Sequence, residues 1–178
     1  KKRFNIKISG IDYDAKYIFS EAGYNFLPSE ISAAFALEQL KKLKKNLKKR
    51  NVNFELLKNF FSKLSKYFKL PEQYKGVKTA WLAFPLVIKK NSKFSRKDLQ
   101  IYLEKNNIQT RTIFTGNILK QPIIKNRKYK KLKNSEKNSN DVMKNGILIG
   151  CHQGMRIEEI NYIFKTFNKF LNKLVKPL

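Results

Sequence analysis

A helical repeat of apolar residues, starting just after Pro28, constrains this chain more than any other feature. The repeat has a spacing of three and four and runs through Ile31, Ala34, Phe35, Leu37, Leu40, Leu43 and Leu47. This spacing marks one face of a helix. Ser29 is suited to cap the helix, because its hydroxyl can accept from a backbone N–H of the first turn. Glu30 adds negative charge where the helix dipole favours it. We therefore predict a helix over 29–50.

A second helical pattern follows directly, through Phe54, Leu57, Phe60, Phe61, Leu64 and Phe68. The two segments are either separate helices or one long, bent helix. Pro71 ends the helical stretch, because proline lacks the N–H that a helix interior requires. The chain then alternates, with strands predicted over 79–88, 109–114 and 147–151 and helices predicted from Ser95 and over 157–174. This order predicts an α+β fold, a small sheet covered by helices.

Three local features qualify that outline. Pro85 lies inside the first predicted strand, so we expect an edge position or a bulge there. Residues 1–28 look irregular but are rich in aromatic side chains, so we expect them to lie across another surface. Residues 125–141 are mostly Lys, Asn and Ser, which favours a mobile surface excursion, followed by a short helix over 141–144.

The charge balance is extreme, with 39 Lys and Arg against 13 Asp and Glu, a net charge of +26. One interpretation is a polyanionic partner such as nucleic acid. The other, which we favour, is compositional drift, because Lys, Asn, Ile and Phe have AT-rich codons. Nucleic-acid-binding motifs are absent, and the aromatic residues follow helix or strand periods typical of a core.

The usual signatures of catalysis are also absent. The sequence has no phosphate-binding Gly-rich loop and no nucleophile elbow. Cys151 and His152 are the only residues of their kinds, and adjacent positions do not chelate a metal easily. A single cysteine fits a reducing compartment, so we expect a cytoplasmic protein. No apolar run reaches the roughly 18 residues of a membrane span. The sequence begins at Lys1, and we expect it to be part of a longer protein.

Five polar residues lie in loops or at strand ends where they could bind a ligand: Asn25, Arg111, Asn117, Gln121 and His152. Residue type alone favours structural hydrogen bonds or solvated side chains for all of them. Arg111 stands out slightly, because a guanidinium at the end of a strand can hold a phosphate or carboxylate through two bonds.

Taken together, several short motifs resemble a known family. Gly23-Tyr24-Asn25, the segment Ser29–Ala34 and Leu37-Glu38-Gln39-Leu40 resemble the start of the small domain in the DegT/DnrJ/EryC1/StrS sugar aminotransferases and dehydratases. Lys2-Arg3-Phe4, Tyr13–Tyr17, Asn107–Arg111 and above all Phe114–Pro122 are similar to one branch, the CDP-4-dehydro-6-deoxyglucose 3-dehydratases of lipopolysaccharide biosynthesis. The resemblance extends from Lys2 to Phe167.

The resemblance implies the C-terminal small domain of an aspartate-aminotransferase (type I pyridoxal phosphate, PLP) fold. Residues 1–28 would continue from a large cofactor domain that precedes residue 1, and residues 29–178 would form the small domain. The residue facing the cofactor, Lys in the aminotransferases and His in the dehydratases, would also lie upstream. The dehydratases use pyridoxamine phosphate (PMP), and some hold an iron–sulfur cluster whose cysteines would again lie upstream.

Carried over residue by residue, the resemblance makes Asn25 a ligand of the cofactor phosphate in the neighbouring subunit, which implies a homodimer. Arg111, Asn117 and Gln121 would contact a nucleotide sugar, and no catalytic residue or metal ligand falls within this sequence. His152 stands where the branch usually has a Tyr-Pro-Gly-like turn, so its role stays open.

Three hypotheses follow for function. The leading one is a nucleotide-sugar 3-dehydratase acting on a 4-keto-6-deoxy sugar, with a reductase as a further partner and with neither nucleic acid nor membrane among its partners. The second is a PLP-dependent nucleotide-sugar aminotransferase of the same family. The third, of another class, is a basic nucleic-acid-binding domain.

Overall fold

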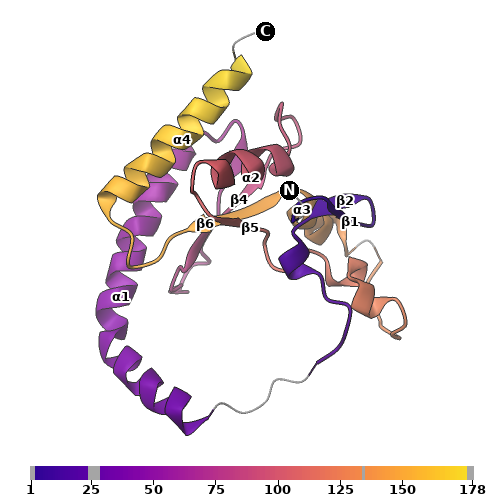
Figure 1. The fold of residues 1–178 in the computed structure, drawn as a ribbon, viewed down its shortest axis with the longest axis horizontal. Helices are drawn as coiled ribbons and strands as arrows, with labels where there is room; N and C mark the ends of the chain where they lie inside the picture. The colour runs from indigo at the N-terminus through magenta and orange to yellow at the C-terminus, as the bar shows by residue number, and fades with distance from the viewer. Residues whose placement is uncertain (1–2, 24–28, 134, 176–178) are drawn as a thin grey trace.

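The computed structural model of the chain describes residues 3–23, 29–133 and 135–175. Its centre is an antiparallel four-stranded sheet in the order β3-β4-β6-β5. These strands are Phe68–Lys69 (β3), Ala83–Ile88 (β4), Thr110–Arg111 (β5) and Gly146–Gly150 (β6). Helices α1 (Glu30–Ser62), α2 (Arg96–Lys105) and α4 (Ile157–Val175) lie beside this sheet (Figure 1). The predicted α+β class, a small sheet covered by helices, is confirmed.

Helix α1 resolves the alternative left open above, because it runs without a break for 33 residues. Ser29 caps it as predicted, since its hydroxyl accepts from the backbone N–H of Ser32. The helix ends at Ser62, earlier than the apolar pattern indicated. Phe68, which the pattern assigned to the helix, instead pairs with Ile88 as part of the short strand β3.

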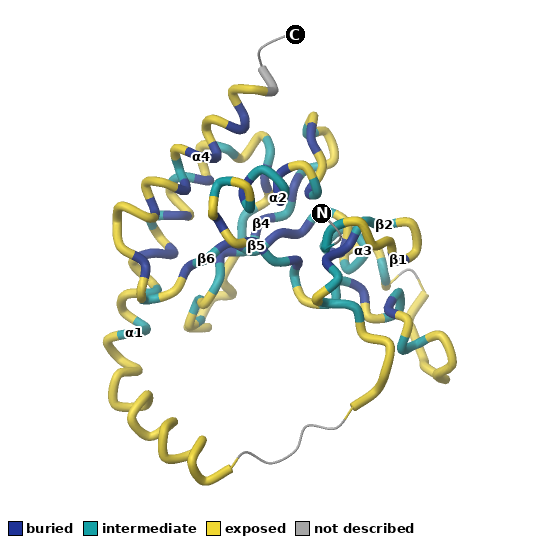
Figure 2. The backbone as a smooth tube through the Cα atoms, viewed as in Figure 1, coloured by how far each residue is buried: buried dark blue, intermediate teal, exposed yellow. Residues whose placement is uncertain are grey.

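The two halves of α1 have different surroundings. The second half buries Phe54, Leu57 and Phe61 against the sheet and α4. The first half carries the apolar repeat that predicted the helix, and in this chain that repeat faces solvent (Figure 2). Ile31 is 84% exposed and Phe35 is 68% exposed. Apolar periodicity therefore identified the helix correctly, but it did not distinguish a face covered within this chain from one that is not.

Aromatic rings fill the core between α1, the sheet and α4. Phe61 stacks on Phe84 with ring centroids 5.5 Å apart, and it meets Phe167 edge-on at 4.9 Å. Such offset and edge-on pairs add stability beyond the area that they bury. Leu86, Leu99, Leu103 and Ile147 complete a fully buried centre. The Phe-rich composition is therefore accounted for largely by this core.

Within residues 3–23, the structure corrects the interpretation of the N-terminal segment as irregular. Strands β1 (Ile6–Ile8) and β2 (Ile11–Tyr13) form a hairpin, which Ser9 and Gly10 close with φ angles of 51° and 77°. Such positive φ angles are typical of tight hairpin turns. Ile8 and Tyr13 pack against Met143 of α3 (Lys137–Asn145). The hairpin therefore lies beside α3 (Figure 1). Short 3₁₀ turns follow at Ala15–Tyr17, Ile118–Lys120 and Pro122–Ile124.

Three further expectations have mixed outcomes. Pro85 lies in β4, an inner strand of the sheet, yet β3 pairs only with Val87 and Ile88. Pro85 therefore has a strand on one side only, that of Leu148, and its position is locally an edge as predicted. Ser95 caps α2 through a capping box with Asp98. The predicted surface excursion is too long, because α3 already begins at Lys137.

Candidate functional site

The candidate site is the segment that follows β5, residues 112–121, which we call the β5 loop. Gly116 fixes how closely it approaches α3. Its φ is +66°, and a Cβ added there would lie 2.5 Å from the Cβ of Met143 and 2.7 Å from its Cα. Only glycine combines this backbone angle with such a close approach. The loop is therefore packed tightly on α3.

Asn117 and Gln121 hold this loop from inside. Asn117 is 3% exposed and Gln121 is 2% exposed. The Asn117 amide donates to Asn140 Oδ1 at 2.8 Å, and its oxygen accepts from the N–H of Leu119 at 3.0 Å. Gln121 donates to the carbonyl of Thr115 at 3.0 Å and accepts from the N–H of Phe19 at 3.3 Å. Both amides are thus engaged by protein groups, and the predicted contact of either one with a nucleotide sugar stays a prediction.

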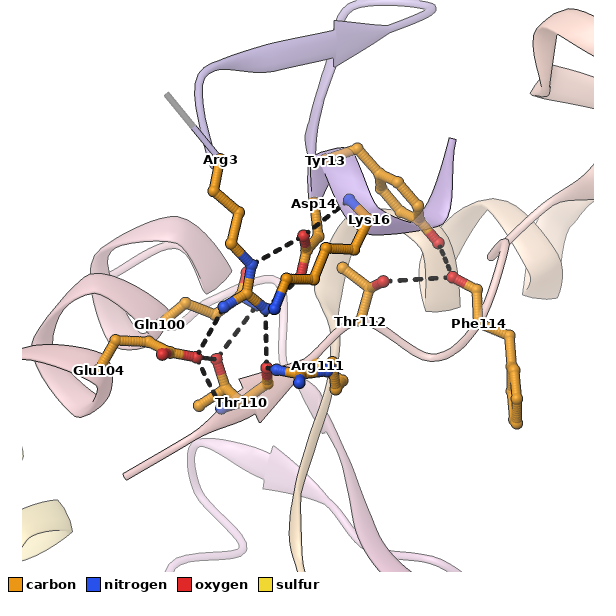
Figure 3. Close-up of polar contacts among 10 residues, drawn as sticks. All are labelled: Arg3, Tyr13, Asp14, Lys16, Gln100, Glu104, Thr110, Arg111, Thr112 and Phe114. Atoms are coloured by element: carbon orange, nitrogen blue, oxygen red, sulfur yellow. Dashed lines mark hydrogen bonds and ion pairs between the residues drawn. The ribbon is translucent and has the colours of Figure 1, made fainter. Parts of the chain in front are cut away.

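The segment that precedes the N-terminal hairpin bonds to β5 through Arg3 (Figure 3). Its guanidinium makes two bonds to the carboxylate of Asp14, which is fully buried. The same guanidinium donates to the carbonyl of Thr110 at 3.0 Å and to Glu104 at 3.3 Å. Burial by itself would raise the pKa of Asp14, but the bonds from Arg3 and from the N–H of Lys16 outweigh it, and the pKa is lowered.

Glu104 closes this network from the side of α2. One of its carboxylate oxygens accepts from the N–H of Thr110 at 2.7 Å and from its hydroxyl at 2.9 Å. Three elements distant in sequence therefore meet at Thr110, the residue before Arg111. Each charged group in the network has a partner of opposite charge or a polar partner, as partly buried charges require. The result is a fixed starting point for the β5 loop.

A second set of bonds fixes the carbonyl of Phe114. It accepts from the buried hydroxyl of Tyr13 at 2.6 Å and from the hydroxyl of Thr112 at 3.2 Å (Figure 3). Burial raises the pKa of Tyr13, so its hydroxyl stays protonated and able to donate. The hairpin therefore determines the position of the β5 loop as well as that of β5.

Arg111 lines a cleft that neither Asn117 nor Gln121 lines. It is half-buried and lines a cleft of about 580 Å³ between β5, β6 and the start of α4, together with His152, Glu158 and Tyr162. One guanidinium nitrogen donates to the carbonyl of Thr110 at 2.8 Å. The cleft has an apolar floor that includes Ile149 and Ile163. The carboxylates of Glu158 and Glu159 also line the cleft, so a ligand there would meet groups of both charges.

The remaining predicted residues have different outcomes. Asn25 lies outside the described residues, so its predicted contact with a cofactor phosphate stays a prediction. His152 is exposed at the rim of the cleft, and its Nδ1 accepts from the N–H of Gly154 at 3.2 Å. Cys151 is fully buried, and burial raises the pKa of its thiol to about 12. It is therefore a thiol of the core, without the thiolate character that reactivity requires.

Neither a metal-binding cluster nor a membrane-spanning helix is found among the described residues. Within 3–23, 29–133 and 135–175, no three His, Cys, Asp or Glu side chains gather as a metal site would require. A phosphate-bearing cofactor needs several convergent donors, whereas the loop amides described above are already engaged. In the same described ranges, no helix is long and apolar enough to cross a membrane.

Sequence reasoning missed the residues that hold the loop, namely Arg3, Tyr13, Asp14, Glu104 and Thr112. One sequence signal could have identified Asp14. Acidic residues are scarce in this chain, and Asp14 directly follows Tyr13 and lies 11 positions after Arg3. Local periodicity could not pair Arg3 with Thr110, since the two are 107 positions apart.

The same fold occurs in solved structures of nucleotide-sugar enzymes with bound PLP. The chain belongs to the DegT/DnrJ/EryC1/StrS aminotransferase family, whose sequence model matches residues 1–168. The family resemblance seen in the sequence is confirmed.

Two curated relatives and one solved structure are similar to this chain. The lipopolysaccharide biosynthesis protein RfbH of Salmonella typhimurium is 30% identical over 95% of this chain and 39% of its own length. GDP-4-keto-6-deoxy-D-mannose 3-dehydratase of Escherichia coli O55:H7 is 33% identical over 88% of this chain and 41% of its own length. A crystal structure of GDP-4-keto-6-deoxymannose-3-dehydratase with a trapped PLP–glutamate geminal diamine has a TM-score of 0.64 at 31% identity. It aligns over 82% of this chain and 37% of its own.

The chain therefore spans about two fifths of the length of the curated relatives that it matches.

Proposed function

We propose that this chain is the C-terminal part of a nucleotide-sugar 3-dehydratase that acts on a 4-keto-6-deoxy sugar in lipopolysaccharide biosynthesis. The observation that carries the proposal is the 30–33% identity to RfbH and to a 3-dehydratase over most of the chain. The boundary near residue 28 belongs to the same proposal, with residues 1–28 continuing from a large cofactor domain and 29–178 forming the small domain.

The cofactor in this proposal is PLP or PMP. In the PMP form it would supply the amino group, and its ring the electron sink, needed to remove the C3 hydroxyl. Asn25 would donate its amide N–H to the cofactor phosphate of a neighbouring subunit, which makes the enzyme a homodimer. An amide adds a bond to phosphate without adding charge. An iron–sulfur cluster and a reductase partner are further proposals, and any cluster ligands would come from outside this chain.

The proposed work of the described residues is binding and positioning. Arg111 would hold an anionic group of the nucleotide sugar, because its guanidinium lines the cleft described above and can make two bonds to a phosphate. Asn117 and Gln121, which the resemblance makes contacts of the nucleotide sugar, would also keep the β5 loop in place through the internal bonds described above. We further propose a cytoplasmic location, which accords with the unpaired buried thiol of Cys151.

The test uses the product of the full reading frame that encodes this chain. GDP-4-keto-6-deoxymannose would be incubated with this protein, PLP and glutamate, with and without a flavin-dependent reductase, and products would be separated by mass spectrometry. We expect a sugar that has lost its C3 hydroxyl. We also expect residues 1–178 alone to give no turnover. Turnover by them alone would contradict the proposal that a preceding domain binds the cofactor.

The same assay tests the alternative, a nucleotide-sugar aminotransferase, which the family's description favours. A 4-amino sugar that retains its C3 hydroxyl would establish that alternative. The codons upstream of Lys1 provide an independent check, because a Lys at the position facing the cofactor would exclude the dehydratase. Tight DNA binding with a steep salt dependence, in a protein indifferent to PLP, would instead favour the basic nucleic-acid-binding hypothesis.

A further inference from the structure

A second cleft lies between the N-terminal hairpin and the chain that follows the β5 loop. Its volume is about 480 Å³, and residues 7–9 of the hairpin line one wall. Residues from the stretch 119–129 line the other wall, and both stretches lie on the side of the molecule away from α1 and α4 (Figure 1). We call this the basic cleft, because four of its lining side chains are cationic, namely Lys7, Lys120, Lys125 and Arg127. Its lining shares no residue with the cleft of Arg111.

The charges of the basic cleft are not balanced within the described chain. No Asp or Glu is among the described residues that line it. In the described ranges, Lys7, Lys125 and Arg127 also take part in no ion pair. Lys120 is partly engaged, because it adds to the effect by which Lys131 lowers the pKa of Glu136. A concave site lined by one sign of charge attracts ions of the opposite sign.

Another lysine-rich cleft shows what a scatter of surface lysines produces in this chain. That cleft lies between the start of α2 and α3, and five lysines line it. Asp98 and Asp141 line it as well, and Asp141 pairs with Lys69 at 3.0 Å. Its lysines therefore have carboxylates beside them. The basic cleft differs in this respect, so its charge is better suited to an external anion.

The walls of the basic cleft are held by bonds and packing within the chain. The backbone N–H groups of Lys125 and Arg127 each donate to the carbonyl three residues earlier, at 3.0 Å. Gln121 anchors the same stretch from inside through the bonds described above. On the opposite wall, Ile8 is buried against Met143 of α3. A ligand would thus meet cations carried on hydrogen-bonded segments, which reduces the conformational freedom lost on binding.

The rest of the lining is suited to an organic ligand of moderate size. Tyr129 lines the cleft and is 49% exposed. An exposed aromatic ring near cations offers a stacking surface for a base beside donors for phosphate. Leu119, Pro122 and Ile124 add apolar surface. The volume lies within the range of small-ligand sites.

We propose that the basic cleft binds the diphosphate group of a nucleotide, with Lys7, Lys125 and Arg127 as its charged partners. Adjacent phosphates concentrate negative charge, which matches a cleft without carboxylates. A guanidinium can bond two phosphate oxygens at once, and each lysine supplies a compact charge. A free nucleoside diphosphate and the diphosphate of a nucleotide sugar present the same chemistry. The inference therefore does not depend on the reaction proposed above.

The first experiment measures the dissociation constant of GDP for the full reading-frame product by calorimetry. We expect GDP to bind at least about tenfold more tightly than guanosine, which lacks the phosphates. Lys125→Gln combined with Arg127→Gln should weaken GDP binding at least about tenfold, as the loss of charge-assisted hydrogen bonds implies. Both side chains are exposed, so the melting temperature should not change.

The matched control is Lys44→Gln combined with Lys45→Gln. This pair removes the same charge from exposed positions on α1, and we expect GDP affinity within about twofold of wild type because distant charges are screened. A second comparison tests the hairpin wall. Lys7→Gln should weaken GDP binding about threefold, whereas Lys16→Gln, an exposed lysine outside the cleft, should not.

The second experiment identifies the source of the diphosphate. Steady-state kinetics with GDP-4-keto-6-deoxymannose would be measured for the wild type and for the variant altered at Lys125 and Arg127. A KM raised about tenfold, with GDP as a competitive inhibitor of the wild type, would assign the cleft to the nucleotide sugar. An unchanged KM with non-competitive GDP would assign it to a free nucleotide at a separate site.

The remaining outcomes separate this inference from the proposed function. Absence of GDP binding, unchanged GDP affinity in the Lys125 and Arg127 variant, or equal weakening in the Lys44 and Lys45 variant would overturn the inference alone. The charge would then be compositional drift. Tight binding of a single-stranded oligonucleotide that the cleft variant loses, without binding of GDP, would reassign the cleft to nucleic acid and also overturn it. A protein that binds GDP in the cleft but turns over no nucleotide sugar would instead contradict the proposed function.

Discussion

Asp14 is the residue on which the position of the hairpin depends. Its carboxylate is fully buried, and Arg3 and the N–H of Lys16 are its partners. Those partners lower its pKa even though burial acts in the opposite direction. A carboxyl group with a lowered pKa stabilises the fold above its unfolded-state pKa of about 4, and that contribution is lost as the pH falls through the lowered folded value.

We therefore predict that Asp14→Asn lowers the free energy of unfolding by about 2 kcal/mol at pH 7, since a charged hydrogen-bond partner is lost. The difference from wild type should stay constant from about pH 7 to 5 and shrink below about pH 4. Urea unfolding of the variant and the wild type at each pH measures this difference in free energy. Glu38→Gln is the control, because its exposed pair with Lys41 should contribute little. A difference that persists undiminished at low pH would contradict the assignment.

Gly116 is a second residue for which the structure predicts a specific loss of stability on substitution. Alanine at this position would be strained by the left-handed φ, and its Cβ would clash with the backbone of Met143, so the loop or α3 would have to move. We expect Gly116→Ala to destabilise the chain by about 2–3 kcal/mol, within the usual cost of overpacking. Gly23→Ala is the matched comparison, because a Cβ at that position meets no atom of the described residues within 4 Å. Equal melting temperatures for the two variants would show that the loop yields easily.

At the scale of elements, α1 combines two environments in one helix. Phe61 is fully buried in the aromatic core, whereas Phe35 is 68% exposed. Phe61→Ala is predicted to lower the free energy of unfolding of this chain by about 3–5 kcal/mol. Phe35→Ala should change it by less than about 0.5 kcal/mol. Denaturant titration of the two variants compares them directly, and similar losses would mean that the first half of the helix is covered in solution.

The elements with a regular apolar period were predictable from sequence. The helix from Ser29, the capping box at Ser95 and the last helix all follow from side-chain spacing and cap chemistry. The hairpin was missed because its strands are three residues each, too short for alternation to be recognised. Phe68 was misassigned because an apolar residue at a helical interval also fits a buried strand position.

The candidate site was predictable only in its location. Residue type favoured structural hydrogen bonds or solvated side chains for Asn117 and Gln121, and both amides do lie inside and bond to the chain itself. Their contact with a nucleotide sugar, which the resemblance implied, stays a prediction. The exposed ring of Phe114 could not be foreseen, because a positive φ at an aromatic residue depends on contacts with distant segments.

At the scale of the whole molecule, Cys151 reports on global unfolding. It is the only cysteine, it is fully buried, and its thiol is protonated at neutral pH because burial raises its pKa to about 12. We predict that a thiol-reactive chromogenic disulfide reacts with the native chain at pH 8 only as fast as the chain opens. In strong denaturant one thiol per chain should react at once. Rapid reaction in buffer would show that this part of the core opens locally.

The bond between Arg3 and Thr110 also bears on the order in which the molecule assembles. It joins positions 107 apart, and the bond from Tyr13 to Phe114 joins positions 101 apart. Closing such long loops is entropically costly, so contacts of this kind tend to form late. Late contacts have little effect on how fast a protein folds and a large effect on how slowly it unfolds. The contacts of the docked hairpin would thus slow unfolding of the native state more than they change the rate of folding.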